Sequence, residues 1–266
     1  MMNLTLFKRE IKSNYKVFFI IFAVLLMYTS VVTSMFDPNL GSILEQFSQT
    51  MPELMSAFGM TSPGSTFIEF LSSYLYGFIY LVFPLIFEII VANKLVARYV
   101  DRGSMAYLLS TPVSRKTIIM TQISVLWITL AALICLMTLA QIIVSHLMFP
   151  GDLDVSRLIY MNIGLYCLHL AISGICFFGS CISNEMKNSY LIGAGIPILF
   201  ILIQMLSNIS DKLDSLKYVT LLTLFPAQEI ASHETNGLFQ AGILLLIATL
   251  LYSLGAYLFT KRDLPL

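Results

Sequence analysis

Long apolar stretches alternate with short groups of basic residues along this chain. Lysine and arginine are absent from residues 17–93, 117–156, 158–186, 188–211 and 218–260. A helix needs about 20 apolar residues to cross a bilayer, and the first window is long enough for two such helices and a loop. The pattern predicts six membrane-spanning helices, over residues 17–36, 67–93, 117–145, 158–182, 190–208 and 238–259.

Three segments outside these spans also show an ordered pattern. Residues 1–16 are expected to form an amphipathic helix in the inner interface, because apolar and basic side chains fall on different sides. The outer loop after the first span repeats this spacing, with Pro52 able to start a helix and Gly59 able to end it. Residues 218–231, YVTLLTLFPAQEIA, are too apolar for an open loop and too short for a span, so we interpret them as re-entrant or interfacial. The apolar positions of the outer loop are Leu40, Ile43, Leu44, Phe47, Met51, Leu54, Met55 and Phe58.

The domain organisation and the orientation follow from the same pattern. No Pro- or Ser-rich linker and no internal repeat divides the chain, so residues 17–266 are expected to form one all-α membrane domain. Cytoplasmic loops of membrane proteins are enriched in Lys and Arg. With the N-terminus inside, the outer side keeps only Arg157, Lys212 and Lys217 of the 15 basic residues. Both termini are therefore predicted to be cytoplasmic.

The predicted outer side is rich in carboxylates. A cationic substrate would explain this asymmetry, but depletion of Lys and Arg from translocated loops predicts it equally well. We favour the second explanation. The residues concerned are Asp37, Glu45, Glu53, Glu69, Asp152, Asp154, Asp211, Asp214, Glu229 and Glu234.

Composition supports a membrane protein. Hydrophobic residues make up 58% of the 266 residues and charged residues only 11%, whereas about a quarter of a soluble domain is charged. The net charge is zero, which gives no indication of nucleic-acid binding. The first apolar run is longer than the core of a cleaved signal peptide, so we expect it to be retained as a span. The four cysteines lie in apolar runs without metal-site spacing and are interpreted as small buried residues: Cys135, Cys167, Cys176 and Cys181.

The sequence gives no sign of an enzyme. It lacks the G-x-x-x-x-G-K-[ST] phosphate loop, so the chain is not expected to hydrolyse ATP itself. Intramembrane proteolysis is the enzyme hypothesis that Ser173 raises by lying one turn from His169, but no oxyanion donors accompany the pair. A metal site is not expected either, since His146, His169 and His233 each lack a second ligand at helical spacing.

Glu88 is the most unusual residue of the predicted spans. It lies six residues before Lys94, about 9 Å deeper along a helix. An ionisable group at that depth is a functional candidate and needs a partner. The alternative is a structural hydrogen bond to a neighbouring helix or contact with headgroup water, and we assign His169 to helix packing. Pro84 and Pro197 are expected to kink their helices.

The connection between the second and third spans, residues 98–116, combines a charged helix end with a short apolar segment. Gly103 can end one helix, and Ser104 can cap another that begins at Met105. Pro112 disfavours the α conformation at Thr111, so that helix must end there. The short helix places apolar side chains on one side, where it forms either a docking surface or an ordinary loop resting on the interface. The candidate docking residues are Arg102, Gly103, Met105, Leu108, Leu109, Pro112 and Arg115.

The stretch YLLSTPVSRK, which follows the Arg102–Gly103 turn, resembles the cytoplasmic connection of permease subunits of type-2 ABC exporters. The resemblance covers the whole chain, including the amphipathic start, six spans and the ending FTKRDLPL, which is similar to Arg-Asp-Leu tails of that group. Such permeases often carry two acidic residues before the glycine turn, whereas this chain has only Asp101 there.

The resemblance implies a transport subunit with external partners. Two copies of a separate ATPase would bind ATP and Mg²⁺ and contact the short helix, and this chain would need no cofactor of its own. The permease would pair with itself or with a sister permease in a prokaryotic plasma membrane. Family substrates include antimicrobial peptides, drugs, lipids and ions, and small systems of this kind favour export of a peptide, drug or lipid-like compound. The alternative function is an ATPase-independent channel or membrane scaffold.

Overall fold

The computed structural model describes residues 2–36, 50–60, 66–209 and 211–263. Several predicted features lie outside these described residues. They are the outer-loop positions Leu40, Ile43, Leu44 and Phe47, the carboxylates Asp37 and Glu45, and the last three residues of the C-terminal tail.

Within the described residues the chain is helical and contains no strand. Six helical stretches of the described chain are long and apolar enough to cross a membrane. This confirms the predicted all-α membrane fold with six long apolar helices. The six stretches are α1 (Leu4–Ser34), α5 with α6 (Ile79–Asp101), α8 (Arg115–Met148), α9 (Val155–Ile182), α10 with α11 (Met186–Ile209) and α13 (Leu238–Lys261).

Helix α1 joins two elements that were expected to be separate. The predicted amphipathic helix over residues 1–16 and the first span form one continuous helix, capped by Asn3, whose side chain accepts from the backbone N–H of Leu6 at 3.0 Å. Residues 13–18 contain no glycine or proline that would end a helix at the junction. A position of residues 1–16 in the membrane interface stays a prediction.

The predicted second span, residues 67–93, is interrupted in the structure. It comprises α4 (Phe67–Leu71), a π-helical turn η1 (Ser72–Tyr76) and α5 (Ile79–Leu95), so the expectation of one unbroken helix was wrong. The break lies at Gly77, where a Cβ atom would stand 2.6 Å from the carbonyl oxygen of Phe58. The outer helix α3 (Pro52–Ala57) begins at Pro52 and is followed by Gly59 at φ +73°, as predicted, and this loop packs on the break.

Helix α9 forms the centre of the bundle. It contacts α13, α5, α10 (Met186–Gly193) and α8, and most of its residues are buried. Close approach to α10 depends on glycines, because a Cβ atom on Gly179 would lie 3.0 Å from the backbone nitrogen of Gly193. Cys167, Cys176 and Cys181 are buried as expected. Cys135 is exposed, because apolar residues on the outer side of a span can face lipid as well as protein.

The fifth span divides at Ala194 into α10 and α11 (Gly195–Ile209), three residues before Pro197. The chain then turns back along α11 as a 3₁₀ segment, η2 (Asp211–Val219). The apolar segment predicted to be re-entrant or interfacial continues as η3 (Leu221–Leu224) and α12 (Ala227–Ala231), which pack against α9 and α13. Its depth in a membrane stays a prediction.

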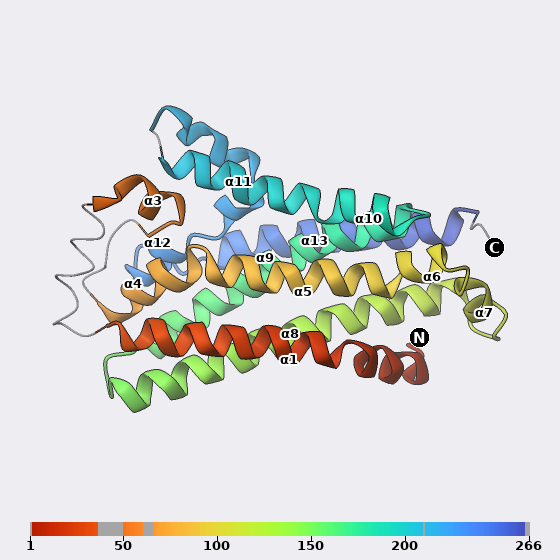
Figure 1. Cartoon of the computed structure of the whole chain (residues 1–266), viewed down its shortest axis with the longest axis horizontal. Coiled ribbons are helices and arrows are strands. Elements are labelled where there is room, and N and C mark those ends of the chain that lie inside the picture. The colour runs from red at the N-terminus through yellow and green to blue at the C-terminus, as the bar shows by residue number, and fades with distance from the viewer. Residues whose placement is uncertain (1, 37–49, 61–65, 210, 264–266) are drawn as a thin grey trace.

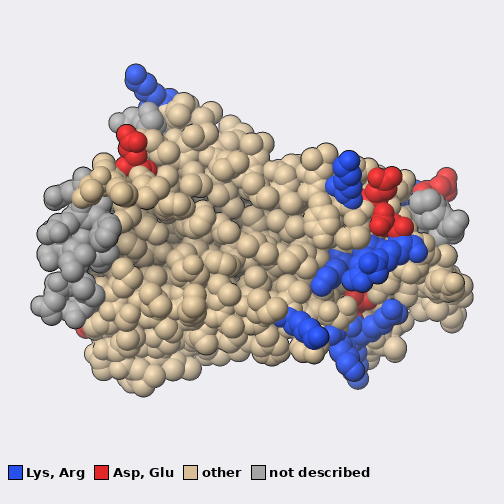
Figure 2. Space-filling view, viewed as in Figure 1, with Lys and Arg blue, Asp and Glu red and all other residues tan. Residues whose placement is uncertain are grey.

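The two ends of the bundle are built from different elements (Figure 1). The start of α1, the end of α13 and the short helix α7 (Met105–Leu109) lie at one end, whereas α3, α4 and α12 lie at the other. Most of the Lys and Arg side chains visible in Figure 2 gather at the end with α7, and the stretch between the ends shows no charged side chain on this face. The two chain ends therefore share one side of the bundle, and their cytoplasmic location stays a prediction.

Candidate functional site

The connection between the second and third spans leaves the bundle where α6 (Ala97–Asp101) ends. Gly103 has φ +65°, a left-handed conformation that strains other residues, and a Cβ atom there would meet nothing within 4 Å. The turn at Gly103 separates α6 from α7, and α7 ends before Thr111, both as predicted. The connection thus presents a five-residue helix beyond the spans.

Ser104 does not cap α7, contrary to our expectation. Its hydroxyl instead donates to the backbone carbonyl of Tyr99, at 3.3 Å, because its backbone is already helical rather than extended. A five-residue helix without a cap has little stability of its own. Packing against the rest of the protein must therefore hold α7 in place.

The three apolar residues predicted to form the docking face of α7 do not all lie on an exposed side of the helix. Met105 is only 1% exposed, so it anchors α7 to the core and cannot belong to an exposed docking face. Leu108 and Leu109 are half-buried, and Leu108 lines a hollow of about 330 Å³ beside the start of α1. Tyr107, which sequence reasoning missed, is 80% exposed and is the most exposed large side chain of α7.

Hydrogen bonds connect the beginning of α8 with the C-terminal ends of α13 and α9. After the exposed Pro112, Ser114 caps α8 by accepting from the N–H of Thr117 at 3.2 Å. Arg115 donates to the carbonyl of Arg262 at 2.9 Å, and Arg262 donates to the carbonyl of Ser183 at 3.1 Å. Partial burial lowers the pKa of the Arg262 guanidinium from its ordinary value, although arginine remains charged at neutral pH. Hydrogen bonds therefore join the start of α8 to the ends of α13 and α9.

Glu88 and His169 form a buried pair in the middle of the bundle. Oε1 of Glu88 lies 2.7 Å from Nδ1 of His169, and both side chains are fully buried. The other ring nitrogen, Nε2, lies 2.8 Å from the carbonyl oxygen of Tyr80. The packing role predicted for His169 is confirmed by this bond, and Glu88 has found the partner that its depth requires.

A single proton must lie between Glu88 and His169. A carbonyl oxygen only accepts, so Nε2 of His169 carries a hydrogen, and Nδ1 then needs either a neutral carboxylic acid or its own proton facing a carboxylate. Either arrangement makes the pair neutral overall and explains why it is tolerated among apolar helices. Pro84 contributes by lacking the N–H that would pair with the Tyr80 carbonyl in an unbroken helix.

Pro197 repeats this arrangement in the fifth span. The proline leaves the carbonyl of Gly193 without its helical donor, and the thiol of Cys176 on α9 donates to it at 2.9 Å. The hydroxyl of Ser180, also on α9, donates to the carbonyl of Ala92 at 3.0 Å. His169 and Cys176 of α9 therefore satisfy the two carbonyls that Pro84 and Pro197 release, and Ser180 adds a third bond from α9. Together these bonds fix α5 and α10 against α9.

The serine considered for proteolysis takes part in helix packing. Ser173 donates to the carbonyl of Leu170 at 3.0 Å and accepts from the phenol of Tyr252 at 2.8 Å. Both ring nitrogens of His169 face other groups. The geometry therefore offers no Ser–His pair, and no group of three or more potential metal ligands occurs in the part of the chain that the structure describes.

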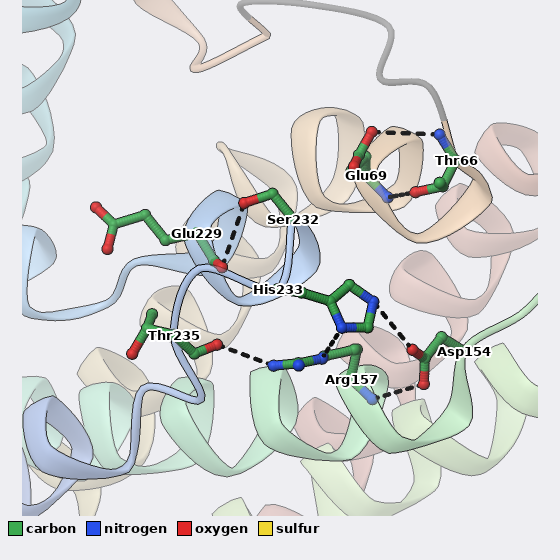
Figure 3. A network of polar contacts seen from close by, with 8 residues as sticks. All are labelled: Thr66, Glu69, Asp154, Arg157, Glu229, Ser232, His233 and Thr235. Atoms are coloured by element: carbon green, nitrogen blue, oxygen red, sulfur yellow. Dashed lines mark hydrogen bonds and ion pairs between the residues drawn. The ribbon is translucent and has the colours of Figure 1, made fainter.

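A polar network at the opposite end fastens residues 226–237, here called the return segment, to α9 (Figure 3). Arg157 donates through Nε to Nδ1 of His233 at 2.8 Å and through Nη1 to the carbonyl of Thr235 at 3.0 Å. Asp154 lies 3.4 Å from Nε2 of His233 and also caps α9. His233 has φ +66°, a conformation that non-glycine residues seldom adopt. Sequence reasoning did not find this network, and only the isolated outer charge of Arg157 hinted at it.

Comparison with known families identifies the fold that these elements build. Comparison with curated proteins and with solved structures returned no significant match. The family model described as ABC-2 family transporter protein matches residues 4–264. Because this match covers nearly the whole chain, the protein belongs to the ABC-2 transporter family and is a permease subunit of that type.

Proposed function

We propose that this chain is the membrane subunit of an ATP-driven exporter and that α7 is the surface on which its ATPase docks. Membership of the ABC-2 family implies association with an ABC ATPase. Two ATPase copies, with ATP and Mg²⁺ bound to them, would act on a pair of permeases in a prokaryotic plasma membrane. The termini and α7 would face the cytoplasm.

The exposure of Tyr107 is the observation that carries this proposal. Tyr107 is 80% exposed at the tip of the bundle, while Met105, two residues earlier, is 1% exposed. An isolated aromatic on a short anchored helix suits a pocket on a partner, because buried aromatic anchors supply much of the binding energy of interfaces. The bonds from Arg115 to Arg262 and on to Ser183 give the docked ATPase a rigid connection to the spans.

The fifth span supports pairing with a second permease. Of the residues of α11, only Pro197 and Ser207 are buried, and α11 projects along the edge of the bundle in Figure 1. The exposed side chains of α11 would face either lipid or a second subunit, which would be a second copy of this chain or a sister permease. A pathway beside them would be apolar, which suits a peptide, drug or lipid-like substrate better than a small ion. The exposed side chains include Ile198, Leu199, Leu202 and Leu206.

Co-purification with the candidate ATPase tests the docking proposal. A chain with a phosphate-loop motif, sought first among the genes adjacent to this one, serves as the candidate. The readouts are the retention of that ATPase on the tagged permease and its rate of ATP hydrolysis. Tyr107→Asp should weaken retention by about tenfold or more, as expected for loss of an aromatic anchor. Tyr218→Asp is the matched control, because Tyr218 is 73% exposed and follows α11 on η2.

Three outcomes would contradict the proposal or favour its alternative. Equal retention of the ATPase by both variants would exclude Tyr107 as an anchor. Loss of retention in both would indicate misfolding of the permease rather than a docking site. Transport that persists in cells without the ATPase would support an ATPase-independent channel or a scaffold instead.

A further inference from the structure

A basic hollow of about 190 Å³ lies where α1 meets α5 and α6. Four cationic side chains line it, and they come from three helices and the turn before α7. The carboxylate at this site belongs to Glu10, which is 2% exposed and accepts the phenol hydrogen of Tyr99 at 2.5 Å. The four cationic residues are Arg9, Lys94, Arg98 and Arg102.

The arginines of the hollow differ from the other arginines of the chain. Arg115, Arg157 and Arg262 each donate hydrogen bonds within the protein. The remaining three arginines all line the hollow, and within the described residues none of them donates a hydrogen bond or forms an ion pair. Glu10 lies near Arg9 and Arg98, but its single charge leaves most of the positive charge uncompensated. A concave site of one charge sign attracts an anion.

The position of the hollow identifies the kind of anion. α1 and α5 continue from it as membrane spans, and on α1 the apolar side chains of Phe19 and Ile20 are 58% and 63% exposed. A ligand seated in the hollow can therefore extend hydrocarbon chains along α1 into the bilayer. Arginine forks match phosphate oxygens in pairs, and basic pockets between helices at the inner membrane surface bind phospholipid headgroups.

We propose that this hollow binds the phosphate-bearing headgroup of an anionic phospholipid from the inner leaflet. The site shares Arg102 with the candidate docking residues but does not include Tyr107, so it is additional to the proposed ATPase contact at Tyr107. The bound phosphate would satisfy the arginines of α1 and α6 together and so hold α1 against the base of the connection.

Native mass spectrometry of the purified chain in detergent tests the proposal. The protein is mixed with phosphatidylglycerol or phosphatidylcholine of the same acyl chains, and the bound fraction of each is measured. Wild-type protein should retain phosphatidylglycerol about tenfold better or more. Arg9→Gln combined with Arg98→Gln should lose most of this preference, whereas Lys8→Gln with Lys12→Gln, the same charge change on α1 outside the hollow, should keep it.

A conservative variant distinguishes the site from misfolding and from other ligands. Arg9→Lys with Arg98→Lys keeps both charges and should retain a measurable preference, even if the glutamine pair fails to fold. Equal binding of the two lipids by wild-type protein would overturn the proposal, as would equal loss of preference in the hollow and control variants. Full displacement of phosphatidylglycerol by inorganic phosphate at the same concentration as the lipid would indicate a site for free phosphate. Loss of ATPase retention with unchanged lipid preference would assign the arginines to the ATPase instead.

Discussion

Glu88 and His169 meet at 2.7 Å between α5 and α9, with neither side chain exposed. The bond joins two helices inside the apolar bundle, where an unpaired charge would be costly and where removing one partner leaves the other unsatisfied. Its dependence on Pro84, which frees the Tyr80 carbonyl for the second ring nitrogen, connects three features that the sequence displays separately.

Glu88→Gln and Glu88→Ala should separate hydrogen bonding from charge. Glutamine can still donate to Nδ1 of His169, so the free energy of unfolding of Glu88→Gln should differ from wild type by less than about 1 kcal/mol. Glu88→Ala should lower the free energy of unfolding by about 2–4 kcal/mol, because it leaves a cavity and an unpaired nitrogen. Unfolding in mixed detergent micelles measures both. We further expect Glu88→Gln to lower transport in the assembled complex, because the pair can no longer exchange its proton. Unchanged transport would assign the pair to packing alone.

Gly77→Ala should destabilise the protein where the second span breaks. The new Cβ atom would meet the Phe58 carbonyl oxygen at 2.6 Å and the Ser73 carbonyl oxygen at 2.9 Å, and neither backbone group can move freely. A loss of about 2 kcal/mol in the free energy of unfolding is expected. Gly242→Ala is the control, because nothing lies within 4 Å of its Cβ position, and it should be neutral or stabilising by about 0.5–1 kcal/mol. Similar losses in both variants would contradict the close approach.

His233→Ala should loosen the return segment at the end opposite α7. The substitution removes the acceptor of Arg157 and the contact with Asp154, so amide hydrogen exchange over residues 226–237 should accelerate about three- to tenfold, the equivalent of one modest hydrogen bond. His146→Ala, at an exposed site in the last turn of α8, is the control and should leave the exchange of residues 226–237 unchanged. Unaltered exchange in His233→Ala would show that apolar packing alone holds the segment.

The number of long apolar helices could be predicted because hydropathy and basic residues act locally. The break at Gly77 could not, since it depends on Gly59, which approaches from the preceding loop. Hydropathy also does not separate lipid-facing from protein-facing residues, which is why Cys135 was expected to be buried.

The candidate site was predicted in outline but not in orientation. Gly103 and Pro112 locate the ends of α7 because backbone geometry requires it. Which side of a five-residue helix faces the protein depends on the neighbours it meets, and Met105 proved to be the anchor while Tyr107 is exposed. Glu88 and His169 were each noticed, but pairing between distant segments requires the packed structure.

Photochemical crosslinking at position 107 tests the proposed ATPase contact most directly. The photoreactive amino acid p-benzoylphenylalanine replaces Tyr107, which is exposed on α7, or Tyr218, which is exposed on η2, in membranes that also contain the ATPase. Illumination should produce a permease–ATPase adduct from position 107 and none from position 218. Absence of the adduct at 107, or equal yields at the two positions, would contradict docking of the ATPase on α7.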